Sequence, residues 1–462
     1  MPRNPGGTVS GFKLLSTPDA PTITGVTTSI GSASVAFTAP SDTGDGAISS
    51  YVVTAVDESS GASTGGTGTS SPITVSPPAG GTFKIRMQAL NPYGPGRLTE
   101  YDTGNQIYSG AELYAWGRNN AGELGTGDTT NLSSPVQVGA DINWSFVSAN
   151  SDHAAAIKTN GTIWGWGDNS SGEVGDNTIV SRSSPVQIGL STDWNSIACG
   201  SSTTAAIKTT GTLWTWGNNF TGELGQNTSP SDVSSPTQVG ALTNWDTVAS
   251  GNGNMVAVKT DGTLWSWGWN SSGQLGDNTT VNKSSPVQIG ALTTWSIIAT
   301  NGARTFAVKL DGTLWAWGSN SYGTLGDNTA VNKSSPVQVG ALTDWSSINT
   351  NNGSSIAVKS DGTLWAWGSN GNGRLGLGDI VNRSSPVQVG ALTTWSSAAL
   401  GSNFAVALKT DGTLWSWGDG NFGQLGDNTT IDKSSPVQIG ALTNWSQVSA
   451  GSYHTTALYG VV

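Results

Sequence analysis

The chain has 462 residues, of which 64 are Gly and only 11% are charged, and its formal net charge is −11. This acidic balance argues against nucleic acid as a partner, because the neutralisation of phosphates requires clustered Lys and Arg. A single cysteine, Cys199, excludes an internal disulfide.

The first 16 residues form an N-terminal segment with one short apolar patch. Phe12, Leu14 and Leu15 make up this patch, which is shorter than the apolar region of a secretory signal. We therefore expect residues 1–16 to be a flexible segment or an anchor for a larger assembly. No stretch of the sequence is apolar over the length that a membrane span requires, so no membrane insertion is expected.

Residues 17–100 alternate short apolar runs with turns rich in Gly, Ser and Pro, a pattern typical of strands. The runs include SASVAFTAP, ISSYVVTAV and GTFKIRMQAL. They resemble a fibronectin type III domain, a β-sandwich of seven short strands, although Val35 and Phe37 stand where that family usually has a Trp. The resemblance implies a spacer or docking module, which we expect to be followed by a linker at residues 101–112.

From residue 113 onward, a unit of about 50 residues is repeated seven times. Two ladders of Trp residues mark the repeat. The first ladder is Trp116, Trp166, Trp216, Trp267, Trp317, Trp367 and Trp417, and the second is Trp144, Trp194, Trp245, Trp295, Trp345, Trp395 and Trp445. A fixed period of this length indicates one supersecondary unit that is stacked repeatedly.

Each repeat contains four predicted strands and no helical periodicity. The four predicted strands of a unit follow the order of the run after Trp345, then SIAVKS, then TLWAWG, then PVQVG, in the letters of the repeat that starts at Gly312. Asp-Gly pairs such as Asp311-Gly312 suit tight hairpin turns that need a positive φ. Four-stranded units of this length form a β-propeller when they are arranged radially.

The two ends of the repeat region complement each other. The first repeat enters at Leu113 without the two strands that should precede it, and the missing pair lies at the other end, between Trp445 and Tyr459. We therefore expect residues 113–462 to form an all-β, seven-bladed propeller that is closed by pairing of its N- and C-terminal strands. Such closure leaves no open sheet edge.

The motifs WG-x-N-x-x-G-x-LG, SPVQVG and DGTLW recur from Leu113 to about Tyr459, and they resemble the regulator-of-chromosome-condensation repeat. This resemblance implies a seven-bladed propeller with a shared closing blade. Members of that family include a chromatin-bound nucleotide exchange factor for a small GTPase and a bacterial protein inhibitor of β-lactamases. They share partner binding on a propeller face, and the fold does not determine which function is present.

Few residues offer catalytic chemistry. The two histidines, His153 and His454, occupy the same repeat position, without the carboxylates or Cys alongside that a metal site needs. Cys199 replaces small or apolar residues of the other repeats, so we expect a buried structural thiol. No Gly-Lys-Ser/Thr phosphate cradle occurs. We therefore expect no catalytic residue, no metal and no cofactor, and hence no enzyme.

Comparison between the repeats separates a constant end from a divergent end. The hairpin GTLW and the connection GALTxW barely change, whereas the turn between the first two strands and the long loop after WG vary. Aromatic and Arg side chains commonly anchor partners, although drift of solvent-facing loops would also diversify this end. We expect the partner site on this divergent face, at Arg118, His153, Phe220, Trp269, Arg304, Tyr322, Phe404, Phe422 and His454.

Surface-type modules, the missing secretion signal and the low-charge composition favour a non-enzymatic structural protein of a bacteriophage virion, of the tail-fibre, appendage or capsid-decoration type. Such a protein would lie on the virion surface. It would bind other virion proteins through its N-terminal region and a host-surface protein or glycan through the propeller. One alternative is a bacterial cell-surface or exported adhesin. The other is a regulator of a small GTPase, which the charge and the added sandwich disfavour.

Overall fold

The computed structural model describes residues 16–29, 32–57, 63–76, 82–106, 110–228 and 231–460. The chain divides into two compact units, Met1–Ser109 and Gly110–Val462. Within the described residues, both units are built of strands, and the helical segments are two 3-10 turns, η1 (Ser321–Gly323) and η2 (Gly371–Gly373). Residues 1–15, nearly all of the predicted N-terminal segment or anchor, lie outside the described residues.

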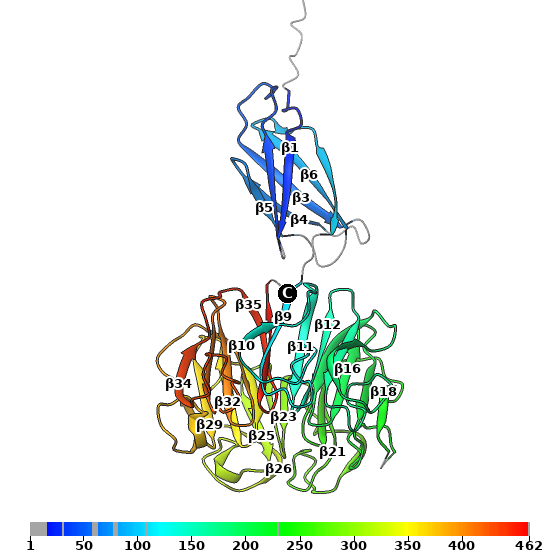
Figure 1. Ribbon diagram of the computed structural model, residues 1–462, viewed down its shortest axis with the longest axis vertical. Helices are drawn as coiled ribbons and strands as arrows, with labels where there is room; N and C mark the ends of the chain where they lie inside the picture. Colours follow the sequence, from blue (N-terminus) through cyan, green and yellow to red (C-terminus); the bar gives the residue numbers. More distant parts are fainter. Residues whose placement is uncertain are drawn as a thin grey trace, which may run out of the picture. The chain divides into compact units, whose positions relative to one another are not determined.

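The N-terminal unit consists of two antiparallel sheets (Figure 1). One sheet contains β1 (Thr22–Ser29), β2 (Ser32–Thr38) and β5 (Ile73–Val75), and the other contains β3 (Ser50–Asp57), β4 (Ser63–Gly68), β6 (Thr82–Asn91), β7 (Gly94–Pro95) and β8 (Thr99–Gln106). Val35 and Val75 of the first sheet share a buried core with Val53 and Ile85 of the second. The segment predicted as a linker, residues 101–112, begins inside a strand, because β8 pairs with β6.

The second unit is a ring of seven four-stranded blades (Figure 1). The first strands of the blades, which line the axis, are β11 (Trp144–Asn150), β15 (Trp194–Cys199), β19 (Trp245–Ser250), β23 (Trp295–Asn301), β27 (Trp345–Asn351), β31 (Trp395–Leu400) and β35 (Trp445–Ala450). The second strands are β12 (His153–Lys158), β16 (Thr203–Lys208), β20 (Asn254–Lys259), β24 (Arg304–Lys309), β28 (Ser354–Lys359), β32 (Phe404–Lys409) and β36 (His454–Tyr459).

The outer half of each blade comes from a third and a fourth strand. The third strands are β9 (Glu112–Gly117), β13 (Ile163–Gly167), β17 (Leu213–Gly217), β21 (Leu264–Gly268), β25 (Leu314–Gly318), β29 (Leu364–Gly368) and β33 (Leu414–Gly418). The fourth strands are β10 (Leu132–Gln137), β14 (Arg182–Gln187), β18 (Val233–Gln238), β22 (Lys283–Gln288), β26 (Lys333–Gln338), β30 (Arg383–Gln388) and β34 (Lys433–Gln438).

Blade 1 combines the two ends of the propeller in the strand order β10-β9-β36-β35. The register of β36 on β9 pairs His454 with Gly117 and Leu458 with Leu113. Blades 2 to 7 then follow in chain order, from β11–β14 to β31–β34. The prediction of an all-β chain with a seven-bladed propeller is confirmed.

In blades 2 to 7, the hairpin between the second and third strands is held by side chains that recur in the repeat. In blade 4, the Asp261 carboxylate accepts hydrogen bonds from the backbone N–H of Thr263 at 3.0 Å and from its hydroxyl at 2.6 Å. The same hydroxyl accepts the indole N–H of Trp265 at 2.9 Å. The ammonium of Lys259 lies 3.7 Å from the ring centroid of Trp265 and 4.8 Å from that of Trp245, a cation–π arrangement. The constant end of the repeat is therefore structural.

Adjacent blades are joined through the first Trp ladder, whose seven side chains are fully buried. Six of these indoles donate a hydrogen bond of 2.9 to 3.0 Å to a backbone carbonyl of the preceding blade. The pairs are Trp116–Gln424, Trp166–Glu123, Trp216–Glu173, Trp267–Glu223, Trp367–Thr324 and Trp417–Arg374. The pair between Trp116 and Gln424 links blade 1 to blade 7, so the same contact also closes the ring.

The indole sits on a glycine of the preceding blade. At the contact between blades 5 and 6, a Cβ added to Gly326 would lie 2.7 Å from Trp367 Nε1, and the φ of this glycine is +78°. Two residues later, the backbone N–H of Asn328 donates to the carbonyl of Ser384 in the next blade at 2.9 Å. Both the close approach and the positive φ explain why this position of the repeat is always Gly.

We expect Gly326→Ala to destabilise the propeller more than Gly340→Ala. Gly340 has a similar φ of +61° but nothing within 4 Å of an added Cβ, so its substitution carries only the backbone penalty of about 1–2 kcal/mol. Gly326→Ala adds the cost of overpacking against Trp367, about 1–3 kcal/mol. Guanidinium unfolding of both variants measures the difference in the free energy of unfolding, and equal losses would show that the indole seat is not tight.

Candidate partner-binding face

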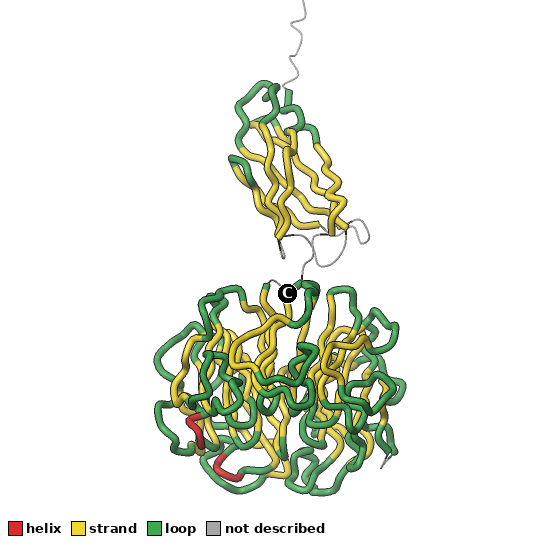
Figure 2. The backbone as a smooth tube through the Cα atoms, viewed as in Figure 1, coloured by secondary structure: helices red, strands yellow, loops and turns green. Residues whose placement is uncertain are grey.

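The divergent face is the end of the propeller that carries the turns between first and second strands and the long loops after the third strands. The two 3-10 turns η1 and η2, drawn in red in Figure 2, belong to these loops. On this face, equivalent positions of the seven repeats carry different side chains. The sequence-predicted site residues all lie on this face, but at very different depths.

One ring of variable residues is buried. The first residues of the second strands are at most 7% exposed, and they are His153, Thr203, Asn254, Arg304, Ser354, Phe404 and His454. Of the residues predicted for the partner site, His153, Arg304, Phe404 and His454 are therefore buried in the propeller. Their variation between repeats reflects different packing inside the propeller.

These side chains are buried because they fold back over the end of the innermost strand. A Cβ added to Gly401 or Gly451 would collide with the ring of Phe404 or of His454, respectively. Other members of the ring reach the next blade: Thr203 Oγ1 lies 2.9 Å from Ser250 Oγ, and Asn254 Nδ2 donates to Thr300 Oγ1 at 2.8 Å. The ring thus packs the rim of the axis and joins neighbouring blades.

The two histidines are structural in this environment. Burial lowers the pKa of His153 to about 4 and that of His454 to about 3, so both rings are neutral at pH 7. His153 Nε2 lies 3.0 Å from Thr204 Oγ1 of the next blade. Cys199 is buried as well, and burial raises the pKa of its thiol to about 12. Among the described residues, no group of three or more His, Cys, Asp and Glu side chains is placed to hold a metal ion.

Other predicted residues do reach the surface. Phe220 is 73% exposed and Tyr322 is 64% exposed, whereas Trp269 and Phe422 are partly exposed. Tyr322 adopts a positive φ of 64° within η1, which turns its side chain outward from a loop of blade 5. These four aromatic residues follow the third strands of blades 3, 4, 5 and 7.

Four side chains from blades 7, 1 and 2 contact one another on this face, and we call them the Arg118 cluster: Arg118, Asp152, Phe422 and Tyr453. The guanidinium of Arg118 lies 4.8 Å from the ring centroid of Tyr453, and the ring of Tyr453 meets that of Phe422 at 5.3 Å, edge to face. Arg118 also forms ion pairs with Asp152 and, at 3.1 Å, with the buried Glu123. The side chain of Arg118 is 17% exposed and that of Asp152 is 37% exposed, so the cluster reaches solvent with a fixed orientation.

Two members of the cluster, Asp152 and Tyr453, were not predicted from the sequence as site residues. Asp152 and Tyr453 each precede a histidine of the buried ring, at a position that is Ser, Gly, Ala or Asn in the other blades. This position lies at the tip of the turn between the first and second strands. The sequence signal for Asp152 and Tyr453 is the same departure from the repeat pattern, at the position just before His153 and His454.

Carboxylates crowd the neighbouring loops. Burial raises the pKa of Asp152, the nearby Arg118 partly opposes this rise, and the charge of Asp168 adds to it. Burial is also the largest cause that raises the pKa of Glu173 to about 7. The guanidinium of Arg118 is thus held among acidic groups.

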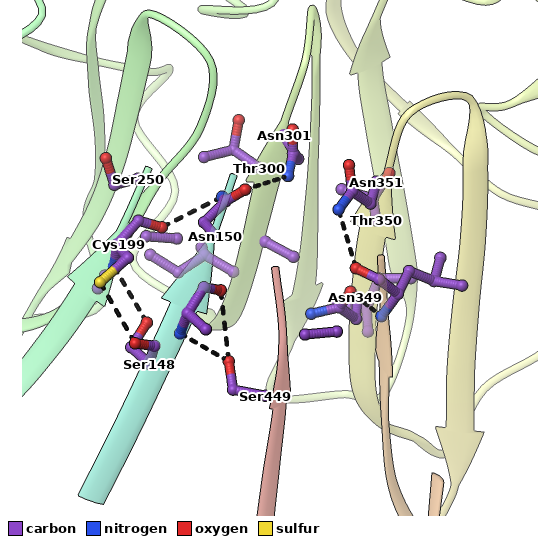
Figure 3. A pocket seen from close by; sticks show the side chains of 18 of the residues that line it. Ser148, Asn150, Cys199, Ser250, Thr300, Asn301, Asn349, Thr350, Asn351 and Ser449 are labelled. Atoms are coloured by element: carbon purple, nitrogen blue, oxygen red, sulfur yellow. Dashed lines mark hydrogen bonds between the residues drawn. The ribbon is translucent and has the colours of Figure 1, made fainter. Parts of the chain in front are cut away.

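The axis of the propeller contains a polar pocket of about 180 Å³, lined by the innermost strands of all seven blades (Figure 3). Asn150 and Asn301 meet across it, with Asn301 Nδ2 donating to Asn150 Oδ1 at 3.4 Å. Asn351 Nδ2 donates to the carbonyl of Leu400 at 2.9 Å. Side-chain amides and hydroxyls line this pocket, and no acidic residue is among its lining residues.

Comparison with protein families gives matches that cover the propeller. The profile of the regulator of chromosome condensation (RCC1) repeat matches residues 111–157, 160–207, 210–258, 261–307, 311–358, 361–408 and 411–458. A second profile of the same repeat matches residues 144–173, 194–223, 245–274 and 395–424. No curated protein matches the chain in a sequence search.

Solved structures resemble the propeller at low sequence identity. Human WBSCR16 has 20% identity and a TM-score of 0.69, over 76% of this chain and 99% of that protein. Prp20p from Saccharomyces cerevisiae, described with its binding to Gsp1p and histones, has the same identity and TM-score and is covered over 92% of its chain. Yeast RCC1 (Prp20) bound to Kap60 is covered over 89%. At this identity, the likeness shows the fold alone.

These findings correct the predicted function. The prediction of a virion structural protein is wrong, because the family that matches all seven repeats is that of the RCC1 repeat. The predicted partners on a virion have no support, whereas the similar yeast structures concern the binding of proteins. The predicted location at a particle or cell surface stays a prediction. Within the described residues, no helix is long and apolar enough to cross a membrane.

We expect Glu173→Gln to stabilise the propeller increasingly as the pH rises from 4.5 to 7. Between these values the buried Glu173 keeps its proton in the native state but loses it in the unfolded state, so its contribution to stability falls with rising pH. Gln already serves at this position in blades 4 and 7, where Gln274 and Gln424 accept the backbone N–H that lies two residues earlier at 2.9 and 2.8 Å.

The pH-dependent part of the gain should reach about 3 kcal/mol above pH 7, because the pKa of Glu173 is raised from its ordinary value of 4.5 to about 7. Denaturant unfolding of the two proteins from pH 4 to pH 8 measures it. The buried histidines add their own pH dependence, but they are present in both proteins and cancel in the difference. A difference that does not vary with pH would contradict the raised pKa.

Proposed function

Since the chain belongs to the regulator of chromosome condensation (RCC1) repeat family, we propose that it is a regulator that acts by binding a protein partner, with a small GTPase as the first candidate. All seven repeats match the family. The similar Prp20p is described with its binding to Gsp1p and histones, and the proposal carries this type of activity to the present chain.

The Arg118 cluster is the observation that supports this proposal most directly. Arg and Tyr are the residue types that dominate binding hot spots. Stacking on Tyr453 and the ion pair with Asp152 hold the guanidinium of Arg118 in one orientation, so little side-chain entropy is lost when a partner binds. The cluster lies where loops of blades 7, 1 and 2 meet, which provides a continuous surface for a folded protein.

Exchange of a nucleotide on a GTPase requires no covalent chemistry from the regulator, because a binding surface that prefers the nucleotide-free state shifts the equilibrium by its differential affinity. We therefore propose that the chain is not an enzyme in the sense of bond-making catalysis. The net charge of −11 disfavours phosphate-rich nucleic acid, but it does not oppose a protein partner, whose affinity depends on local anchors.

For the N-terminal unit we propose a fibronectin type III-like module that spaces or docks the propeller. Its two antiparallel sheets and their shared core support this assignment. The matched repeats begin at residue 111, so this unit is additional to the family's repeat region.

The test is the release of a fluorescent GDP analogue from a panel of small GTPases in the presence of the full chain. We expect one GTPase to release the nucleotide faster, and we expect Arg118→Ala and Tyr453→Ala to reduce that rate by about 30-fold, as removal of a hot-spot anchor worth ~2 kcal/mol would. Arg118→Ala also leaves Glu123 without its ion pair, so the folding of both variants is checked by their melting temperatures.

Leu310→Ala is the matched control. Leu310 is 74% exposed and lies in the hairpin between β24 and β25, on the constant end of the propeller, so its loss should leave the exchange rate unchanged. The proposal fails if no GTPase is accelerated and none forms a complex with the chain in its nucleotide-free state. A loss of activity only in Leu310→Ala would place the partner site on the opposite face.

A further inference from the structure

Two arginines are buried on the divergent face, and only one of them has its hydrogen bonds satisfied. Arg374 is 8% exposed and Arg304 is 7% exposed. Arg374 Nε donates to the carbonyl of Gly371 at 2.9 Å and its Nη1 donates to that of Ser402 at 3.1 Å. The same two atoms of Arg304, Nε and Nη1, are buried and have no partner among the described residues.

An unpaired buried guanidinium is costly to keep. Burial of a charge is tolerated when it is paired and hydrogen-bonded, and breaking such a pair destabilises a protein strongly. Burial is the one cause that lowers the pKa of Arg304, to about 10, and no nearby carboxylate opposes it. Arg304 therefore remains a cation at neutral pH without a counter-charge in the described chain.

Arg304 lies just below the surface. It is the first residue of β24 and pairs in register with Asn301, the last residue of β23. A Cβ added to Gly302, in the turn between these strands, would lie 3.7 Å from Arg304 Nη1. Gly302 is partly exposed and has no side chain, so the guanidinium lies beside a turn that reaches the surface.

In blades 3 and 4, the residue at this repeat position contacts a residue that lines the axial pocket. Thr203 contacts Ser250 and Asn254 contacts Thr300, each at the end of the next innermost strand. The corresponding residue for Arg304 is Thr350, which lines the pocket with Asn301 and Asn351 (Figure 3). Asn301, Thr350 and Asn351 are neutral, and no acidic residue lines the pocket, so this side does not repel an anion.

We propose that the rim of the axial pocket is an oxyanion-binding site, in which the guanidinium of Arg304 takes a carboxylate or a phosphate group. A guanidinium presents parallel N–H groups that match either group in a bidentate manner. This site belongs to the chain itself and does not depend on the proposed GTPase partner. An acidic side chain of a partner and a free anion would use the same chemistry.

The experiment measures melting temperatures of the full chain with increasing sodium phosphate or sodium acetate, against sodium chloride at equal ionic strength. We expect phosphate or acetate to raise the melting temperature of the wild-type chain by at least about 2 °C more than chloride does, since a ligand that binds only the native state stabilises it. In Arg304→Met this specific rise should disappear.

Arg374→Met is the matched control, since it removes an arginine of equal burial that already has partners. Without added anion, Arg304→Met should melt higher than the wild-type chain, because an unpaired buried charge is lost, whereas Arg374→Met should melt lower. Arg374→Met should retain the specific rise with anions, which also corrects for the general stabilisation by excluded salts.

Two results would overturn the proposal. One is an equal anion effect in the wild-type chain and in Arg304→Met. The other is a drop in melting temperature in Arg304→Met as large as that in Arg374→Met, which would mean that internal water already satisfies the guanidinium. If phosphate acts and acetate does not, the site takes a phosphate group; the reverse result assigns it to a carboxylate.

Discussion

The propeller depends on one contact that is repeated around the ring: a buried indole of one blade seated on a glycine of the preceding blade. Six of the seven indoles also donate to a backbone carbonyl beside that glycine. The exception is Trp317, whose Nε1 has no partner in the described part of the chain although its ring occupies the same seat on Gly276. Packing against glycine is therefore the constant element, and the hydrogen bond adds to it. Blade 1, which joins the two chain ends, forms this contact with both blade 7 and blade 2, as the other blades do with their neighbours.

This contact also explains where the chain is free to vary. The glycine and the carbonyl belong to the base of the long loop after each third strand, so that base is fixed by the next blade. The tips of the loops do not form this contact with the indole of the next blade, and they carry Phe220, Tyr322 and Phe422. At the opposite end, hydrogen bonds of Asp and Thr and the stacked Lys and Trp leave little freedom. Variation is thus concentrated on the divergent face.

The repeat allowed the sequence to predict the blade count, the four strands of each blade and the joining of both chain ends, because a fixed period and a missing strand pair leave one arrangement. The depth of the variable residues could not be predicted in this way. Phe404 and Tyr322 both break the repeat pattern, yet one is fully buried and the other is 64% exposed. Tyr322 lies in a loop, whereas Phe404 begins a strand beside Gly401, whose missing side chain provides the space for the ring of Phe404. A residue that differs between the repeats of a propeller can therefore be buried with different packing or exposed to solvent, and the sequence does not distinguish the two.

Function in such a scaffold is best sought where the sevenfold pattern is broken without a structural gain. Phe404 breaks the pattern but fills a space, and His153 breaks it but contacts Thr204 of the next blade. Arg118 breaks it by forming a partly exposed stack with Tyr453, and Arg304 breaks it by burying a charge with no partner among the described residues. Natural proteins keep such unfavourable groups mainly where they serve a purpose. The composition of the chain, averaged over all seven blades, describes the scaffold and conceals these few positions, and for this reason low charge and a high content of Gly, Ser and Thr led to the wrong function.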